Sequence, residues 1–563
     1  MIKVKLEQLA KKLGKNISQI AKETGLNRNT VTAIYHGKID GIKFDTINRL
    51  CELYGLTVND ILEFNSDKQT KKTSAPEYKI YKQEGEAAPF TMFPLFAVFN
   101  KFPKKYFDWG FDTGYGFFRN DYGEWYWNHD AMDSGARRFY QRYNNKAQNQ
   151  ELYKAFMEKA KKLENCYLNL DKDGLMGLSD HEVLSKLNHL RKNFEEYWAI
   201  SMFIDCFDPG FDQEEMKRIA EKNDLDIDEV AVLTTPVEPT FNNECSLDLL
   251  KIIKPLIGPK ANDKKIEIFV KENIRIKQHI KEFDYANTNY AHNEPITNES
   301  LTKEIKKYVG NKVLYNQEYR TLSNYSKNQE QKIKKILKKH HLKNNPLWFF
   351  NKLTTWREVR KKYSIMAIYV FYTLLNIVSE RTGISERYLK YADLDELPGV
   401  FRGMLNSQTL QKRKENGMIV IVKTHDYEVL EDEQAISLRD ELGSKLKGLA
   451  SGEIIPGSVA SRGYAKGIAR IILNKEDFGK LHDGEILVTG MTRPEFLPVM
   501  KKAGGIVTNE GGVTCHAAIV SRELNKPCII GTKNATQLIH DGDLIEVRAN
   551  HGTVRILERF SKS

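Results

Sequence analysis

The stretch Thr508-Asn-Glu-Gly-Gly-Val-Thr-Cys-His-Ala-Ala-Ile-Val-Ser-Arg-Glu-Leu524 decides how the C-terminal part of this 563-residue chain folds and what chemistry it offers. A glycine pair and a histidine precede an amphipathic helical pattern, so we expect His516 at the start of a helix, facing solvent. Imidazole is a nucleophile near neutral pH, and a helix N-terminus stabilises anionic oxygens. The sequence therefore predicts that His516 carries a phosphoryl group. The residues expected to support that phosphate are Gly511, Gly512, Thr514 and Cys515.

Further motifs surround this stretch: Pro456–Gly467, Thr492–Met500, Lys526–Gly531 and Asp541-Gly-Asp543. With them, residues 452–557 resemble the mobile phosphohistidine domain of phosphoenolpyruvate-utilising enzymes, a group that contains phosphoenolpyruvate synthase, pyruvate phosphate dikinase and rifampicin phosphotransferase. The resemblance implies an α/β swivelling domain whose histidine is phosphorylated at one site and delivers the phosphoryl group at another. Asn509, where an acidic residue is commoner, and Asn525, which replaces a glycine, depart from the family pattern.

Two other readings of His516 are available. It could be a structural histidine at a helix cap, or Cys515 could act as a thiol nucleophile beside it. Neighbouring helical residues point about 100° apart, which places Cys515 and His516 poorly as a catalytic pair.

The whole chain has the composition of a multidomain protein. Its length predicts three or four domains, and its net charge of +11 permits an anionic partner without identifying one. The apolar stretch Tyr363–Val378 is expected to be a buried core helix, and we expect no membrane partner and a cytoplasmic location. No disulfide framework or metal site is indicated by the six scattered cysteines, which are Cys51, Cys166, Cys206, Cys245, Cys515 and Cys528.

Residues 1–65 show short helical periodicities broken by glycines, which predicts a bundle of about five helices. Within it, Asn16–Lys38 has the pattern of helix, tight turn at Gly25 and helix, with Ser18 expected as the first cap. A further helix is expected around Phe44–Tyr54. The segment resembles the lambda-repressor/Cro class of helix-turn-helix domain. The residues expected to face inward are Ile20, Ala21, Leu26, Val31 and Ile34.

The resemblance and the open side of the second helix predict DNA binding. Arg28, Asn29 and Thr32 are expected to read bases, and Gln19 and Lys38 to contact phosphates. The complete predicted DNA-binding set is Gln19, Asn27, Arg28, Asn29, Thr30, Thr32 and Lys38. Because operators are usually read by dimers, a homodimer on DNA is expected. A module that only binds protein remains the alternative.

The middle of the chain is expected to start with a flexible linker at residues 66–76. Residues 77–445 then predict a mostly helical domain with an aromatic-rich N-terminal lobe, in which Tyr106–Phe118 and Trp125–Trp127 suggest short strands. Lys332–Lys343 is either a solvated helix face or a nucleic-acid patch. The expected fold class is therefore multidomain: an all-α helix-turn-helix domain, a mostly α middle domain and a C-terminal α/β swivelling phosphohistidine domain.

The sequence does not identify the phosphoryl donor. No phosphate-binding loop or ATP-grasp pattern is recognisable upstream of the histidine domain, and no intrinsic cofactor is expected. We therefore expect ATP or phosphoenolpyruvate, with magnesium, at the site of a separate donor protein. The leading hypothesis is a DNA-binding regulator phosphorylated on His516 in trans. The alternatives are a phosphotransferase subunit that works with a separate ATP-binding chain, and a degenerate scaffold.

Overall fold

The computed structural model describes residues 2–4, 6, 10, 14–36, 43–54, 61–64, 75–98, 107, 114–172, 174–258, 262–422, 427–447, 454–512 and 515–560. The chain divides into two compact units, Met1–Ser74 and Ala75–Ser563, and each is described by itself.

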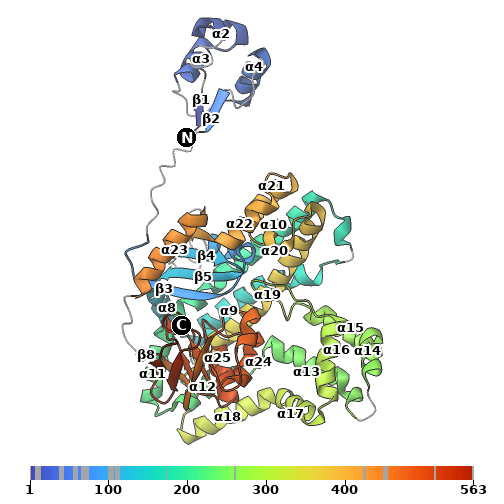
Figure 1. The fold of residues 1–563 in the computed structure, drawn as a ribbon, viewed down its shortest axis with the longest axis vertical. Coiled ribbons are helices and arrows are strands. Elements are labelled where there is room, and N and C mark those ends of the chain that lie inside the picture. Colours follow the sequence, from blue (N-terminus) through green and yellow to red (C-terminus); the bar gives the residue numbers. More distant parts are fainter. Residues whose placement is uncertain are drawn as a thin grey trace. The chain divides into compact units, whose positions relative to one another are not determined.

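The first unit contains the predicted helix-turn-helix, with α2 at Ile17–Thr24, α3 at Arg28–Tyr35 and α4 at Phe44–Tyr54 (Figure 1). Gly25 ends α2 at φ +66°, a left-handed conformation that glycine adopts without strain. Ile20, Ala21, Val31 and Ile34 are buried as expected, and Leu26 packs partly buried against the same core.

Two details of this unit differ from the sequence prediction. Asn16, not Ser18, caps α2: its Oδ1 accepts the Gln19 amide at 3.0 Å, and the Gln19 Oε1 accepts the Asn16 amide at 2.9 Å. The unit also contains an antiparallel strand pair, β1 (Ile2–Val4) with β2 (Leu62–Phe64), which is too short to produce a sequence alternation. The expected count of five helices falls partly outside the described residues.

The second unit begins with a five-stranded antiparallel sheet in the order β3-β5-β4-β6-β7. Its strands are β3 (Ile80–Glu86), β4 (Gly114–Arg119), β5 (Tyr122–Asn128), β6 (Met418–Val422) and β7 (Tyr427–Glu431). Of the aromatic-rich segment, Gly114–Phe118 and Trp125–Trp127 thus lie in strands, whereas residues 106 and 108–113 lie outside the described part of the chain. Within residues 77–445, which are expected to be mostly helical, the sequence pattern does not indicate β6 and β7, because the apolar run of β6 pairs with β4 far away in the sequence.

Side chains alternate between two cores across this sheet. Tyr115, Phe117 and Ile419 pack under α23 (Asp432–Lys447), whereas Phe118 and Val420 face the large helical core. Gly116 lies on the second face, where a Cβ atom would stand 2.2 Å from the Phe96 ring. Glycine therefore lets that ring lie flat against the sheet.

The large core is built around α19 (Trp348–Thr382), which α9 (Lys146–Leu168) and α10 (Asp180–Ser201) flank. By length and composition α19 could cross a membrane, but 78% of its most apolar window is buried inside the protein. Further helices complete this core: α6 (Pro89–Val98), α8 (His129–Tyr143), α11 (Phe211–Lys222), α12 (Ile227–Thr234), α18 (Tyr325–Lys339), α20 (Glu386–Leu389), α21 (Leu397–Phe401) and α22 (Ser407–Asn416).

A second helical cluster has a core of its own (Figure 1). It contains α13 (Phe241–Ile253), α14 (Asp263–Glu272), α15 (Ile274–Phe283), α16 (Asn298–Val309) and α17 (Lys312–Ser323). Its core residues include Leu250, Ile276 and Ile305.

The C-terminal sheet domain, residues 454–560, contains an eight-stranded sheet in the order β8-β15-β14-β10-β11-β12-β13-β9. Strands β10 to β13 run parallel to one another, and the remaining pairings are antiparallel. The strands are Ile454–Pro456, Ser458–Ser461, Tyr464–Ile471, Ile486–Thr489, Gly505–Thr508, Cys528–Ile530, Leu544–Arg548 and Thr553–Glu558, with helices α24 (Leu497–Lys502), α25 (His516–Glu523) and α26 (Ala535–Leu538). Each face of this sheet has its own apolar core.

The end of the predicted linker belongs to the second unit. The Ala75 amide donates to the Glu441 carboxylate at 2.9 Å, and the Lys445 ammonium donates to the Ala75 carbonyl at 3.1 Å. Residues 66–74 lie outside the described part of the chain.

Candidate functional site

The C-terminal sheet domain packs against strand β3. The Glu84 amide donates to the Glu510 carboxyl at 2.5 Å, and the Asn509 amide group donates to Glu84 at 2.7 Å. The Arg493 guanidinium donates to the Glu86 carbonyl at 3.0 Å. Burial, together with the Glu84 carboxylate, raises the pKa of Glu510 well above its usual range. A protonated Glu510 therefore fits this contact, because an ionised one would lie beside a second carboxylate.

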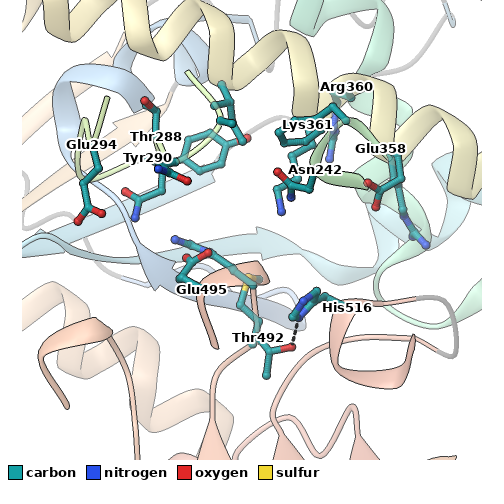
Figure 2. Close-up of a pocket in the computed structure, with 18 of the residues that line it drawn as sticks. Asn242, Thr288, Tyr290, Glu294, Glu358, Arg360, Lys361, Thr492, Glu495 and His516 are labelled. Atoms are coloured by element: carbon teal, nitrogen blue, oxygen red, sulfur yellow. Dashed lines mark hydrogen bonds between the residues drawn. The ribbon is translucent and has the colours of Figure 1, made fainter. Parts of the chain in front are cut away.

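A cavity of about 780 Å³ lies between the C-terminal sheet domain, the five-stranded sheet and the helices (Figure 2). Its apolar walls include Phe96, Trp125, Trp127, Trp198 and Ile365. Its volume falls in the range of pockets that enclose drug-sized organic ligands. The aromatic residues of the N-terminal lobe thus serve both the core and the wall of a pocket.

His516 stands on the wall of this cavity as the first residue of α25. The Cys515 Sγ atom caps the helix by accepting the Ala518 amide at 3.4 Å, and Ala517, Ala518 and Val520 are buried beneath it. The expected helix start is therefore present. His516 is half-buried on the wall of this cavity, so part of its surface remains exposed, as expected, while its ring also faces the cavity.

The surroundings of His516 keep its imidazole neutral. Burial lowers its pKa from the ordinary value to about 3, and the positive charge of Lys361 acts in the same direction. The Nδ1 atom lies 2.8 Å from the Thr492 hydroxyl. If the neutral ring donates a hydrogen bond from Nδ1–H to the Thr492 hydroxyl, the lone pair of Nε2 is available for nucleophilic attack.

The residues expected to support a phosphate have several structural tasks. Gly511 has φ +115°, and a Cβ atom there would stand 2.6 Å from the Cys515 Sγ atom, so only glycine fits beside the cap. The Cys515 amide donates to the Gly512 carbonyl at 2.9 Å and is committed to that turn. At Gly512 an added Cβ atom would make only ordinary contacts, 3.6 Å or more from Asp212 and Gln213. Thr514 lies outside the described residues.

Helix α19 brings three cations to the same cavity, and carboxylates hold two of them. Arg360 makes two hydrogen bonds to Asp205, at 2.7 and 2.9 Å, and Arg357 donates to Asp208 at 2.9 Å. Lys361 makes no hydrogen bond or ion pair with any residue in the described part of the chain. Burial lowers the pKa of Lys361, and the carboxylates of Glu358 and Glu495 oppose that shift.

Figure 2 shows the histidine and the α19 cations on facing walls of the cavity. His516 and Thr492 come from the C-terminal sheet domain, and Lys361 and Arg360 come from α19. Glu495 projects into the space between them, and its Oε1 is buried with no hydrogen-bond partner among the described residues. A nucleophilic nitrogen thus faces a cation and a carboxylate inside a chamber lined by aromatic side chains.

Sequence reasoning missed Arg357, Arg360, Lys361, Glu495 and the partnership of Thr492. The cations stand in Arg357-Glu-Val-Arg-Lys-Lys362, directly before the apolar part of α19. A charged run before an apolar run is the only signal, and it equally fits a solvated helix end.

The predicted DNA-contacting residues that the structure describes lie on α2 and α3 or at the cap of α3. Arg28, Asn29 and Thr30 are exposed on α3, and Asn27 caps that helix by accepting the Asn29 amide at 2.8 Å. Thr32 is half-buried and its hydroxyl donates to the Arg28 carbonyl at 2.8 Å. Gln19 is exposed, although its side-chain oxygen takes part in the α2 cap. Lys38 lies outside the described residues.

Comparison with known proteins assigns both ends of the chain. Residues 481–552 match the mobile domain of PEP-utilising enzymes, and residues 5–67 match the Cro/C1-type helix-turn-helix DNA-binding domain.

Several phosphoenolpyruvate synthases are similar to part of the chain. A probable phosphoenolpyruvate synthase of Archaeoglobus fulgidus is 38% identical over 176 residues, 31% of this chain and 23% of that protein. A probable phosphoenolpyruvate synthase of Methanothermobacter thermautotrophicus is 48% identical over 101 residues, 18% of this chain and 15% of that protein. The phosphoenolpyruvate synthase of Pyrococcus furiosus is 38% identical over 141 residues, 25% of this chain and 16% of that protein.

The chain thus spans less than a quarter of the length of each of these relatives. It carries a Cro/C1-type helix-turn-helix DNA-binding domain in its N-terminal part and the mobile domain of PEP-utilising enzymes in its C-terminal part.

Proposed function

We propose that the chain is a DNA-binding phosphotransferase component. His516 receives a phosphoryl group at the site of a separate donor protein, from ATP or phosphoenolpyruvate with magnesium. It then delivers the group to an acceptor held in the cavity. Of the two hypotheses from the sequence, we favour the phosphotransferase subunit over the regulator. The reason is that the histidine faces a cavity large enough for an organic acceptor.

The observation that carries the proposal is the ammonium of Lys361 across the cavity from His516, which makes no hydrogen bond or ion pair with any described residue. Burial disfavours this cation although the Glu358 and Glu495 carboxylates oppose that effect, and an anion placed directly beside the ammonium stabilises it further. A phosphoryl group on His516 brings about two negative charges into the same space. The lysine therefore fits a phosphorylated histidine better than it fits the free one.

The geometry supports a transfer step in which the protons balance. The Nδ1 proton stays on the ring and bonds to Thr492, so a phosphoryl group on Nε2 makes the ring a cationic leaving group. When an acceptor hydroxyl attacks phosphorus, the P–N bond breaks, a P–O bond forms and the ring returns to its neutral state. The hydroxyl proton passes to the carboxylate of Glu495, which accepts no hydrogen bond at Oε1 from the described residues.

Incubating the full chain with labelled ATP or labelled phosphoenolpyruvate, with and without host lysate, tests this function. We expect an acid-labile label on the wild-type chain, no label on His516→Ala, and loss of label when a small-molecule extract of the lysate is added. Equal labelling of both chains, or no label with either donor and lysate, would contradict the proposal.

The N-terminal unit supports a second role, binding to DNA, and we propose that the chain does so as a homodimer. Arg28, Asn29 and Thr30 are exposed on the second helix of the motif, which is the helix that enters the major groove in proteins of this type. We propose that Arg28 and Asn29 read bases, with Thr32 beside them, and that Gln19 and Lys38 contact phosphates. Retardation of genomic fragments by the full chain tests this role. If neither the full chain nor residues 1–74 shifts any fragment at low salt, the module serves protein binding instead.

A further inference from the structure

A cysteine, a histidine and an aspartate meet where helix α13 packs against α15. His279 is 1% exposed. Its Nδ1 atom lies 2.8 Å from the Asp248 carboxylate, and its Nε2 atom lies 3.9 Å from the Cys245 sulfur. Cys245 and Asp248 are three residues apart on α13, so both face the histidine. Arg275, one turn before His279 on α15, lies 3.7 Å from the second oxygen of Asp248.

This cluster opens onto the cavity, because Cys245 and His279 are both part of its wall. When the Asp248 carboxylate accepts a hydrogen bond from the Nδ1–H group of His279, the lone pair of Nε2 faces the thiol. A nucleophile, a base and a group that orients the base are thus arranged in order. The transfer of a phosphoryl group from His516 makes no use of them.

The thiol is unreactive without this base. Burial raises the pKa of Cys245 to about 12, and the carboxylates of Glu304, Asp248 and Glu282 act in the same direction. At neutral pH the sulfur therefore keeps its proton. Bond formation requires His279 to take that proton as the sulfur attacks, in the way that a histidine activates a serine hydroxyl.

We propose that Cys245 is a second reactive centre of the cavity, at which carbon electrophiles of the α,β-unsaturated carbonyl class are captured as thioethers. The sulfur forms a bond to the β-carbon, the carbon–carbon π bond breaks, and the electron pair moves to the carbonyl oxygen. The thiol proton goes to His279 Nε2 and from there to the α-carbon. Nothing is oxidised and no group leaves. The aromatic walls Trp125, Trp198 and Phe241 suit planar compounds of this class.

The test uses the full chain and N-ethylmaleimide, with the adduct at each cysteine followed by peptide mass mapping. We expect a Cys245 adduct whose rate of formation falls at least tenfold in His279→Asn and severalfold in Asp248→Asn. The control His181→Asn, at an exposed histidine of α10, should leave the rate unchanged. Cys51 and Cys166, which are half-buried, provide reference rates that no variant should alter.

A second measurement on the wild-type chain protects the test against a variant that fails to fold. Base-assisted attack predicts a rate that increases much less than tenfold per pH unit, whereas an unassisted thiol of raised pKa predicts the full tenfold increase. The unassisted profile, an unchanged Cys245 rate in His279→Asn, or no adduct at Cys245 when Cys51 is labelled would each overturn the proposal. The outcome is independent of His516 phosphorylation.

Discussion

Replacing Lys361 with methionine removes the one cation of the cavity wall that has no partner among the described residues, while it keeps most of the side-chain volume. A hydrogen bond to a charged group contributes about 1.5–3 kcal/mol. Because about 1.4 kcal/mol corresponds to a tenfold change in rate, phosphorylation of His516 should slow about 10- to 150-fold. Lys362→Met is the matched control, because the neighbouring lysine pairs with Glu244 at 3.7 Å and does not line the cavity.

Phosphoramidate, a small donor that phosphorylates histidine directly, allows this measurement without a donor protein. The initial rate of phosphohistidine formation is followed by mass spectrometry for the wild-type chain and both lysine variants. Circular dichroism should show that all three chains are folded. If Lys361→Met and Lys362→Met phosphorylate at the wild-type rate, the ammonium does not stabilise the phosphoryl group, and the argument from the unpaired cation is refuted.

Further predictions concern the histidine, its helix and the DNA-binding unit. In nitrogen NMR, His516 should remain neutral from pH 8 to 5, because its pKa is about 3. The unfolded chain binds this proton more tightly, so the free energy of unfolding should decrease as pH falls from about 6.5 towards 3. Titration of His516 near pH 6.5 would contradict this. Thr492→Val should slow phosphorylation about tenfold by releasing the ring tautomer, and wild-type kinetics would exclude that role. Gly511→Ala should lower stability by about 1–3 kcal/mol in thermal unfolding, and an unchanged midpoint would show that the φ +115° turn tolerates a side chain. Arg28→Ala should abolish sequence-specific gel retardation, whereas Lys38→Ala should weaken binding to all sequences; identical effects would remove the distinction between base and phosphate contacts.

Local patterns could be predicted from the sequence. The turn at Gly25, the helix Phe44–Tyr54 and the helix that starts at His516 depend on glycines and apolar spacing within a few residues. The sheet position of β6 could not, because an apolar run of five residues fits a buried helix as well as a central strand. Its partner β4 lies in a remote part of the sequence.

In the candidate site, too, residues in contiguous motifs could be predicted, and residues that depend on distant contacts could not. His516 could be predicted because its surrounding motif is contiguous in the sequence. Lys361 and Glu495 could not, because only the folded chain shows which carboxylates pair with Arg357 and Arg360. Only the folded chain also shows that Lys361 and the Glu495 Oε1 atom make no hydrogen bond with the described residues. The docked position of the C-terminal sheet domain was equally inaccessible, since it depends on contacts between β3 and residues such as Asn509 and Glu510.

The pairing of β4 with β6 sets an order on folding during synthesis. β4 is complete at Arg119, but its neighbour β6 begins at Met418, after all the helices from α8 to α22. Until the ribosome has released β6, the aromatic strands have an unpaired edge, which is a site for aggregation. The N-terminal unit has no such dependence, because its own core closes within the first 64 residues. The DNA-binding unit is therefore expected to fold early, while the cavity is assembled only after most of the chain has been made.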